Sequence, residues 1–221
     1  MCYLRQNQKE MGGNMSAKKA KKMIDNYYVV FVEGDADELI IKRLISYYKS
    51  KGWMCHGELK IKNTHGTPCM RSIKMGLTGY QQSKENAICF KAVICEYDTD
   101  IFEKGLQEIP DWVSIKNDIK KKFNVKNFCC IEAKTSIEDW ILDDLSGLLK
   151  SLGLTKGTKP KGDYGQDKVK DLFKRKNMVY DRNKGAHTIK PIIDRLDIEK
   201  IRDARISELE KFEKILGIKI S

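Results

Sequence analysis

Hydrophobic residues gather in short runs along the chain, and four of these runs predict strands. The first covers residues 28–32 and is β-branched and aromatic without a polar break. That pattern is typical of a central strand covered on both faces. Further strands are predicted at residues 58–61, 87–95 and 128–131.

Segments with helical periodicity alternate with these strands. They are predicted at residues 35–51, 67–79 and 111–123, and from Ser136 onward. Strands that alternate with helices of this length favour a parallel sheet with right-handed crossovers. We therefore predict an α/β fold with a mostly parallel four-stranded sheet flanked by helices.

Two of the predicted helices begin with capping signals. Asp35 is expected to cap the first helix, with Glu38 three residues later as its capping-box partner. Thr67 and Pro68 are expected to act as the N-cap and first-turn proline of the second helix.

Acidic residues directly follow two of the predicted strands. Glu33 ends the first strand and Asp37 lies in the following turn of helix, while Asp98 and Asp100 follow the third strand. In open α/β sheets, ligands bind outside the carboxyl ends of the strands. Carboxylate oxygens are the ligands that hard divalent cations such as Mg²⁺ prefer. The sequence therefore predicts a divalent-metal site at this edge of the sheet.

The charge distribution divides the chain into three parts. The formal net charge is +11, yet residues 27–150 hold 18 basic and 18 acidic side chains. Residues 1–26 hold 6 basic and 2 acidic side chains and are predicted to form a basic tail, and residues 151–221 hold 18 and 11. A neutral domain with an acidic cluster between basic segments suits a polyanion held near bound metal. Solubility alone is the alternative explanation for the lysines.

The last part, residues 151–221, is predicted to be a basic linker followed by helices. Residues 154–165 are rich in Gly, Lys and Pro, which favours a linker or a substrate-facing loop. Helical patterns follow at residues 167–176, 189–196 and 206–216. We expect these helices to pack as an appendage on the domain formed by residues 27–150.

The composition favours a cytoplasmic protein. The seven cysteines are an odd number and contain no C-x-x-C pair, and several lie within apolar strand patterns. They are therefore expected to be small buried hydrophobic residues in a reducing compartment. No stretch approaches the ~20 apolar residues of a membrane span, and the N-terminal residues lack the apolar core of a signal peptide. We hypothesise that translation begins at Met15, because the preceding residues match a translated ribosome-binding sequence.

The acidic motifs resemble those of the TOPRIM domain, the metal-binding module of topoisomerases, bacterial primases, small ribonucleases and OLD-type nucleases. The similar motifs are E-G-x-x-D, which spans Glu33 and Asp37, and D-x-D, which spans Asp98 and Asp100. The resemblance covers residues 27–145.

A third motif, S-I-E-D-W-I-L from Ser136, is similar to the acidic helix start of the OLD-like branch. It adds Glu138 to the site that the resemblance implies. The alternative is a helix whose apolar residues are core and whose acids face its own N-terminal dipole.

The resemblance also implies roles for these residues. Glu33, Asp98, Asp100 and Glu138 would bind Mg²⁺ or Mn²⁺, and Asp37 and Glu138 would bind a second ion or orient water. In OLD-like nucleases a lysine outside the acidic motifs is thought to assist phosphate cleavage, and Lys184 is the corresponding candidate here. An ordinary surface loop is the alternative for the segment around Lys184.

The function that the resemblance implies is a divalent-metal-dependent nuclease, with DNA favoured over RNA, in a defence or repair setting. An RNA-processing TOPRIM ribonuclease and a non-catalytic nucleic-acid-binding partner of an ATPase are the alternatives. The chain has no G-x-x-x-x-G-K-[ST] loop, so an ATPase partner would be encoded separately. The lysines expected to contact phosphates are Lys18, Lys19, Lys21, Lys22, Lys156, Lys159 and Lys161.

Overall fold

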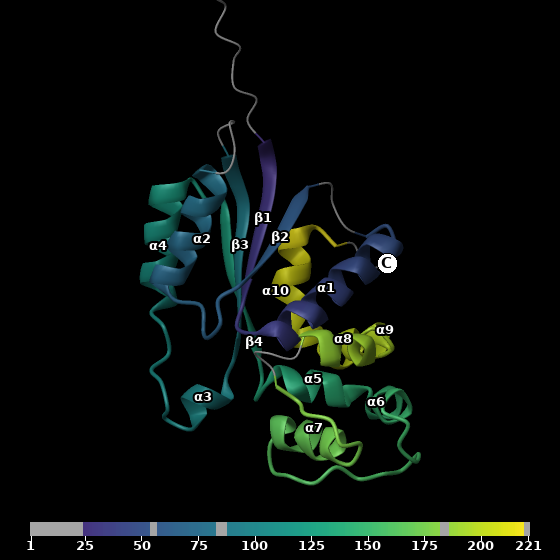
Figure 1. Cartoon of the computed structure of the whole chain (residues 1–221). Helices are drawn as coiled ribbons and strands as arrows, with labels where there is room; N and C mark the ends of the chain where they lie inside the picture. Colours follow the sequence, from purple (N-terminus) through teal and green to yellow (C-terminus); the bar gives the residue numbers. More distant parts are fainter. Residues whose placement is uncertain (1–23, 54–56, 83–87, 182–185, 219–221) are drawn as a thin grey trace, which may run out of the picture.

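The computed structural model describes residues 24–53, 57–82, 88–181 and 186–218. Within these residues the chain forms an α/β fold, with a four-stranded sheet between two layers of helices (Figure 1). The strand order is β2-β1-β3-β4, and every neighbouring pair is parallel. The strands are β1 (Ile24–Val32), β2 (Glu58–Asn63), β3 (Ile88–Asp98) and β4 (Asn127–Ala133). The predicted fold class is confirmed.

The central strand β1 packs against both layers. Alternate residues of a strand point to opposite faces, and Val29 and Phe31 contribute to one hydrophobic cluster while Tyr28 and Val30 contribute to the other. None of these four side chains is more than 1% exposed. The unbroken apolar run thus reflects a strand buried on both faces.

Strand β3 extends further than its hydrophobic pattern predicts. The sequence indicates an end at Cys95, whereas the strand continues to Asp98. It continues because β4 pairs with it there: Glu96 lies opposite Ile131, and Asp98 lies opposite Ala133. The extension places two acidic residues within the sheet.

Ten helices in the described residues cover the sheet and its carboxyl edge. On one face lie α2 and α4, and on the other lie α1 and several helices from the C-terminal part (Figure 1). Their bounds are α1 (Asp35–Ser50), α2 (Met70–Gln82), α3 (Asp100–Glu103), α4 (Trp112–Phe123), α5 (Ile137–Asp143), α6 (Leu145–Ser151), α7 (Gly165–Lys174), α8 (Ala186–Ile193), α9 (Ile198–Ala204) and α10 (Ile206–Leu216).

Both predicted capping arrangements are wrong. Gly34 takes the N-cap position of α1, and the Asp35 carboxylate instead accepts a hydrogen bond from Asn63 Nδ2 at 3.0 Å. The second helix begins at Met70 instead of residue 67. His65 and Gly66 adopt positive φ angles of 54° and 138° in the turn after β2, so Thr67 and Pro68 still belong to the loop.

The helices beyond residue 151 share a hydrophobic core with the sheet. Leu172, Leu209 and Phe212 belong to the same cluster as the inner face of α1. A buried ionic contact adds to it: Arg202 Nε lies 2.8 Å from Glu213 Oε1, and the Tyr48 hydroxyl donates to the same oxygen at 2.8 Å. These contacts join α9 and α10 to α1.

None of the helices in the described part of the chain has the length and apolar character needed to span a bilayer.

Candidate metal centre

Three buried carboxylates meet at the carboxyl edge of the sheet. Asp37, Glu96 and Asp98 each offer an oxygen atom, and these atoms all lie within 4.8 Å of one another. None of the three residues is more than 1% exposed. Asp37 lies in the first turn of α1, and the other two lie at the end of β3. The fold brings them together because β1, which leads into α1, is paired with β3.

The alternation of strand residues explains why Glu96 and Asp98 face the same place. They are two residues apart, so they lie on one side of β3. Tyr97 points to the other side, where its ring stacks on Trp112 at a centroid distance of 5.0 Å. Glu96 was not among the candidate ligands predicted from the sequence, because the strand was expected to end at Cys95. The E-x-D spacing within a longer strand is the signal that could have identified it.

The donor set fits a hard divalent cation. All three groups are carboxylates, and ligands on opposite sides of a Mg²⁺ ion lie about 4.2 Å apart. The observed limit of 4.8 Å therefore requires only a small inward movement of the side chains. Carboxylates this close repel one another unless a cation or a proton offsets their charge. The cluster could thus hold a metal ion.

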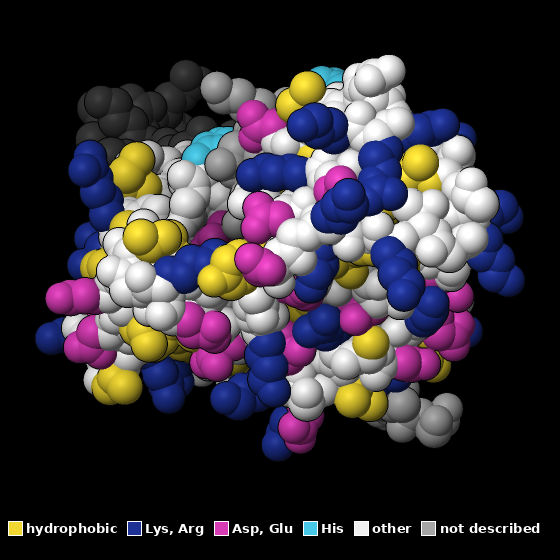
Figure 2. All heavy atoms as spheres, turned by 90° about the horizontal axis from the view of Figure 1, so that it is seen from below, with side chains coloured by type: hydrophobic (Ala, Val, Ile, Leu, Met, Phe, Trp, Pro, Cys, Tyr) yellow, Lys and Arg dark blue, Asp and Glu magenta, His cyan; other side chains and the backbone are white. Residues whose placement is uncertain are grey.

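The face of the molecule at this edge of the sheet carries mixed charge. Figure 2 views it along the strands from their carboxyl ends and shows lysine and arginine side chains interspersed with acidic ones. A metal centre beneath such a face would have cationic groups around it that can contact an anionic substrate.

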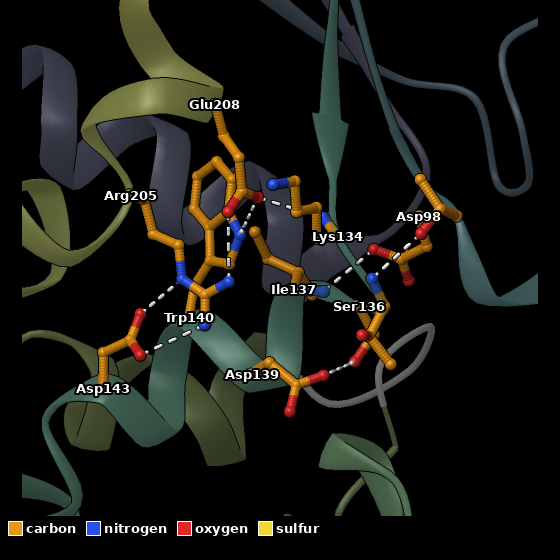
Figure 3. Close-up of polar contacts among 11 residues, drawn as sticks. Asp98, Lys134, Ser136, Ile137, Asp139, Trp140, Asp143, Arg205 and Glu208 are labelled. Atoms are coloured by element: carbon orange, nitrogen blue, oxygen red, sulfur yellow. Dashed lines mark hydrogen bonds and ion pairs between the residues drawn. The ribbon is translucent and has the colours of Figure 1, made fainter.

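The backbone of α5 holds the Asp98 carboxylate in place. Oδ1 of Asp98 accepts a hydrogen bond from the backbone N–H of Ile137 at 2.8 Å (Figure 3). Ile137 is the first residue of α5, so Asp98 satisfies one of the N–H groups that every helix start leaves without an intrahelical acceptor. The same contact fixes the position of α5 relative to β3.

Glu138 is the second residue of α5 and is fully buried. Its Oε1 atom accepts a hydrogen bond from the Tyr180 hydroxyl at 2.9 Å. Its neighbours Ile137 and Trp140 are also fully buried, which confirms that the apolar residues of this motif are core. Glu138 is not a member of the three-carboxylate cluster, and its role in a metal site stays a prediction.

Asp139 faces a different environment from Glu138. Its carboxylate accepts a hydrogen bond from the Ser136 hydroxyl at 3.2 Å (Figure 3), and it lies against Gly165 at the start of α7. Partial burial raises the pKa of Asp139, although the Ser136 hydroxyl and the charges of Lys168 and Arg205 partly oppose the increase. Ser136 takes the N-cap position of α5, but its side chain makes no capping hydrogen bond.

The other two ligands predicted from the sequence, Glu33 and Asp100, are not members of the three-carboxylate cluster. Glu33 lies just beyond β1 and is 7% exposed, and its backbone oxygen accepts a hydrogen bond from Gly66 at 2.8 Å. Asp100 begins α3 and pairs with Lys104 at 2.6 Å. The D-x-D motif spans the end of the strand, so Asp98 belongs to the cluster while Asp100 does not.

Glu208 supports the segment that connects β4 to α5. Its Oε2 atom accepts hydrogen bonds from the Lys134 backbone at 2.9 Å and from the Trp140 indole at 3.1 Å (Figure 3). Arg205 donates to the Oε1 atom at 3.1 Å and also to Asp143 at 2.5 and 3.1 Å. Glu208 comes from α10, 74 residues after Lys134, and no local motif marks it. Sequence reasoning therefore missed it.

The predicted phosphate-binding lysines are only partly described. Lys18, Lys19, Lys21, Lys22 and Lys184 lie outside the described residues. Lys156, Lys159 and Lys161 are exposed. Lys156 and Lys159 also line a cavity of about 850 Å³ together with Lys150 and Arg195.

Comparison of the chain with family models, curated proteins and solved structures finds no match.

Proposed function

We propose that the protein is a divalent-metal-dependent nuclease. The observation that carries the proposal is the buried group of Asp37, Glu96 and Asp98, whose oxygen atoms lie within 4.8 Å of one another. Mg²⁺ or Mn²⁺ bound there would lower the pKa of an attacking water and stabilise the charge that develops on the phosphate. The acidic motifs that resemble the TOPRIM domain support the same assignment and favour the OLD-like branch.

The protein's own groups have distinct tasks in this proposal. The three carboxylates bind the ion, and the Ile137 N–H, 2.8 Å from Asp98, keeps one of them oriented. The Tyr180 hydroxyl, which donates to Oε1 of Glu138 at 2.9 Å, fixes the direction of that carboxylate. A carboxylate held in this way can orient a water molecule and accept its proton.

The proposed substrate rests on the net charge of the chain and on the resemblance of its acidic motifs to those of the OLD-like nucleases. The net charge of +11 favours a polyanion. DNA is proposed ahead of RNA because the third acidic motif is similar to that of the OLD-like nucleases, and a separately encoded ATPase is the proposed partner on the same ground. An RNA-cleaving activity is the alternative, and the experiment below distinguishes the two.

The experiment is to incubate the purified chain with plasmid DNA, single-stranded DNA and structured RNA in Mg²⁺, Mn²⁺ or EDTA. We expect cleavage of DNA in Mn²⁺ or Mg²⁺ and none in EDTA. Asp98→Asn should abolish it, whereas a contaminating nuclease would remain active in that variant. Cleavage of RNA alone would favour the ribonuclease alternative. Cleavage of no substrate, with candidate ATPase partners added, would contradict the nuclease assignment.

A further inference from the structure

We infer that the groove between α2 and the edge strand β2 binds a single strand of the nucleic-acid substrate. The inference rests on the proposed nuclease function and specifies where the substrate is bound. Four features of the groove support the inference: its shape, its charge, its exposed apolar surface and its hydrogen-bonded connection to the end of β1 next to Glu33.

Two glycines of α2, Gly76 and Gly79, are among the residues that line the groove. The volume of the groove is about 750 Å³. A Cβ atom on Gly76 would lie 2.6 Å from the Phe31 ring, so only glycine allows the helix to pack this closely. At Gly79, a Cβ atom would meet nothing within 4 Å, so the absent side chain leaves this part of the groove open.

The groove is basic. Lys62, His65 and Arg71 line it, and no acidic residue is among its lining residues, all of which belong to the described part of the chain. Lys62 and Arg71 are both exposed, so their charged ends can reach a ligand. Cations along a groove contact the backbone phosphates of a nucleic acid.

The same groove also presents apolar and aromatic surface. Met75 is 65% exposed, and Tyr80 lines the wall beside it. An edge-to-face contact with Tyr27, at a centroid distance of 5.7 Å, holds the Tyr80 ring. In a duplex the base faces are stacked inside, whereas a single strand can stack its bases on aromatic side chains. Cations next to apolar surface therefore favour a single strand.

Hydrogen bonds join one end of the groove to the edge of the sheet that carries the metal centre. The Thr64 N–H donates to the Val32 oxygen at 2.9 Å, and the Gly66 N–H donates to the Glu33 oxygen at 2.8 Å. Thr64 lines the groove, and Glu33 leads directly into α1, which carries Asp37. One end of the groove therefore lies near the carboxyl ends of β1 and β2, the same end of the sheet at which the acidic cluster lies.

The test is fluorescence anisotropy with a labelled single-stranded oligonucleotide and with a duplex of the same sequence. EDTA is present, so binding is measured without cleavage. We expect the full-length chain to bind the single strand more tightly than the duplex. Replacing both cations, as Lys62→Gln with Arg71→Gln, should weaken single-strand binding about tenfold and lower its salt slope by roughly 1.4 units, since each lost phosphate contact accounts for about 0.7 units.

Two comparisons separate the groove from general effects. Lys116→Gln with Lys121→Gln removes the same charge from exposed positions on α4 and should leave affinity within about twofold. Tyr80→Leu should lower single-strand affinity about tenfold while Tyr80→Phe retains it, because stacking needs the ring. Circular dichroism melts confirm that each variant is folded.

Several outcomes would overturn the inference. The first is that the chain binds the duplex as tightly as the single strand. The second is that the variant with both Lys62 and Arg71 replaced binds the single strand as tightly as wild type. The third is that the α4 control variant loses as much single-strand affinity as the groove variant does. If these variants bind normally while the protein still cleaves DNA in Mn²⁺, the groove assignment fails and the nuclease function stands. If the chain neither binds nor cleaves any nucleic acid, the proposed function fails and the groove assignment fails with it.

Discussion

Glu96 shows how one buried side chain can set the properties of the acidic cluster. It lies on the same side of β3 as Asp98 and is fully buried. Replacing it with glutamine keeps the shape and removes one of three crowded charges. We expect Glu96→Gln to melt about 2–4 °C higher than wild type in EDTA, which corresponds to about 1 kcal/mol for a chain of this size, and to gain less from Mn²⁺. Thermal melts with and without the ion measure both effects.

A surface acid provides the matched control for Glu96. Glu103→Gln removes the same charge from an exposed position on α3 and should leave both the melting temperature and the gain from Mn²⁺ unchanged. If Glu96→Gln gains as much from the ion as wild type does, Glu96 does not contribute to metal binding.

Glu138 is the residue on α5 whose loss should affect turnover most. Glu138→Gln preserves the helix and the side-chain volume but removes the charge that orients the attacking water in the proposed mechanism. We expect turnover to fall on the order of a hundredfold or more while nucleic-acid affinity stays nearly constant. Single-turnover cleavage rates and anisotropy on the same preparations test the two parts separately.

Asp139 is the internal control for Glu138, because adjacent helical residues point about 100° apart. Burial raises the pKa of Asp139 above its usual value, so the folded state holds this proton more tightly than the unfolded state. Asp139 therefore contributes to the free energy of unfolding at low pH. This contribution is lost as the pH rises through the raised pKa of Asp139. Asp139→Asn should be neutral or slightly stabilising at neutral pH and should keep turnover. An essential Asp139 beside a dispensable Glu138 would contradict the register assigned to α5.

Local sequence could identify part of the acidic cluster. Asp37 and Asp98 were found because each follows a recognisable apolar strand, and the structure places both in the cluster. Asp100 was chosen for the D-x-D spacing, but the chain leaves the sheet after Asp98 and begins α3 at Asp100. Glu208 is held by tertiary contacts from a distant helix, and no local pattern encodes such contacts.

Helix α10 supports the segment between β4 and α5, and this support can be tested through Glu208. Three donors converge on its carboxylate, and the segment that it holds includes Ile137, which donates to Asp98. Glu208→Gln weakens the contact with Arg205 and places an amide NH₂ group where one carboxylate oxygen accepts hydrogen bonds. We expect the affinity of the protein for the metal ion to fall several-fold, although Glu208 is not itself a ligand.

Terbium luminescence sensitised by the tryptophans of the chain measures the effect of Glu208→Gln on ion binding. A positioning role predicts weaker Tb³⁺ binding and a changed number of water molecules on the ion, read from lifetimes in H₂O and D₂O. Glu210→Gln, an exposed neighbour on α10, should behave as wild type. Unchanged affinity and lifetimes in a folded Glu208→Gln variant would limit Glu208 to a structural role.

The secondary structure could be predicted where hydrophobic periodicity is strong. All four strands and α1, α4 and α10 lie where the pattern predicts them. The N-cap of α1 and the start of α2 were wrong because the chain uses Gly34 and a turn with positive φ angles at His65 and Gly66. Such turns depend on contacts between distant segments, for example between Asp35 and Asn63. The short helix α9 has too few residues to produce a clear periodic pattern.

At the scale of the whole molecule, the C-terminal helices are joined to the sheet through a common core. Leu209 and Phe212 of α10 belong to the same cluster as Ile40 and Leu44 of α1. The buried contact between Arg202 and Glu213 lies in the same region. The basic residues that follow residue 151 therefore belong to a part of the chain that packs against the domain with the acidic cluster.

The excess positive charge predicts strongly salt-dependent binding of nucleic acid. If Lys156, Lys159 and Lys161 contact phosphates, replacing all three with glutamine should lower the slope of log affinity against log salt concentration by roughly 2 to 3 units, since each contact accounts for about 0.7–0.9 units. Anisotropy titrations across a series of KCl concentrations give the slope. An unchanged slope would remove these three lysines from the binding surface.

The most direct test of the acidic cluster as the metal centre is calorimetric titration of Mn²⁺ into wild type, Asp98→Asn and Asp100→Asn. Asp98 lies in the cluster and Asp100 pairs with Lys104 outside it, so the two variants remove the same charge two residues apart. We predict that Asp98→Asn lowers Mn²⁺ affinity at least tenfold, because the ion loses a carboxylate ligand, and that Asp100→Asn binds as wild type does. Equal affinity in wild type and Asp98→Asn would contradict the assignment.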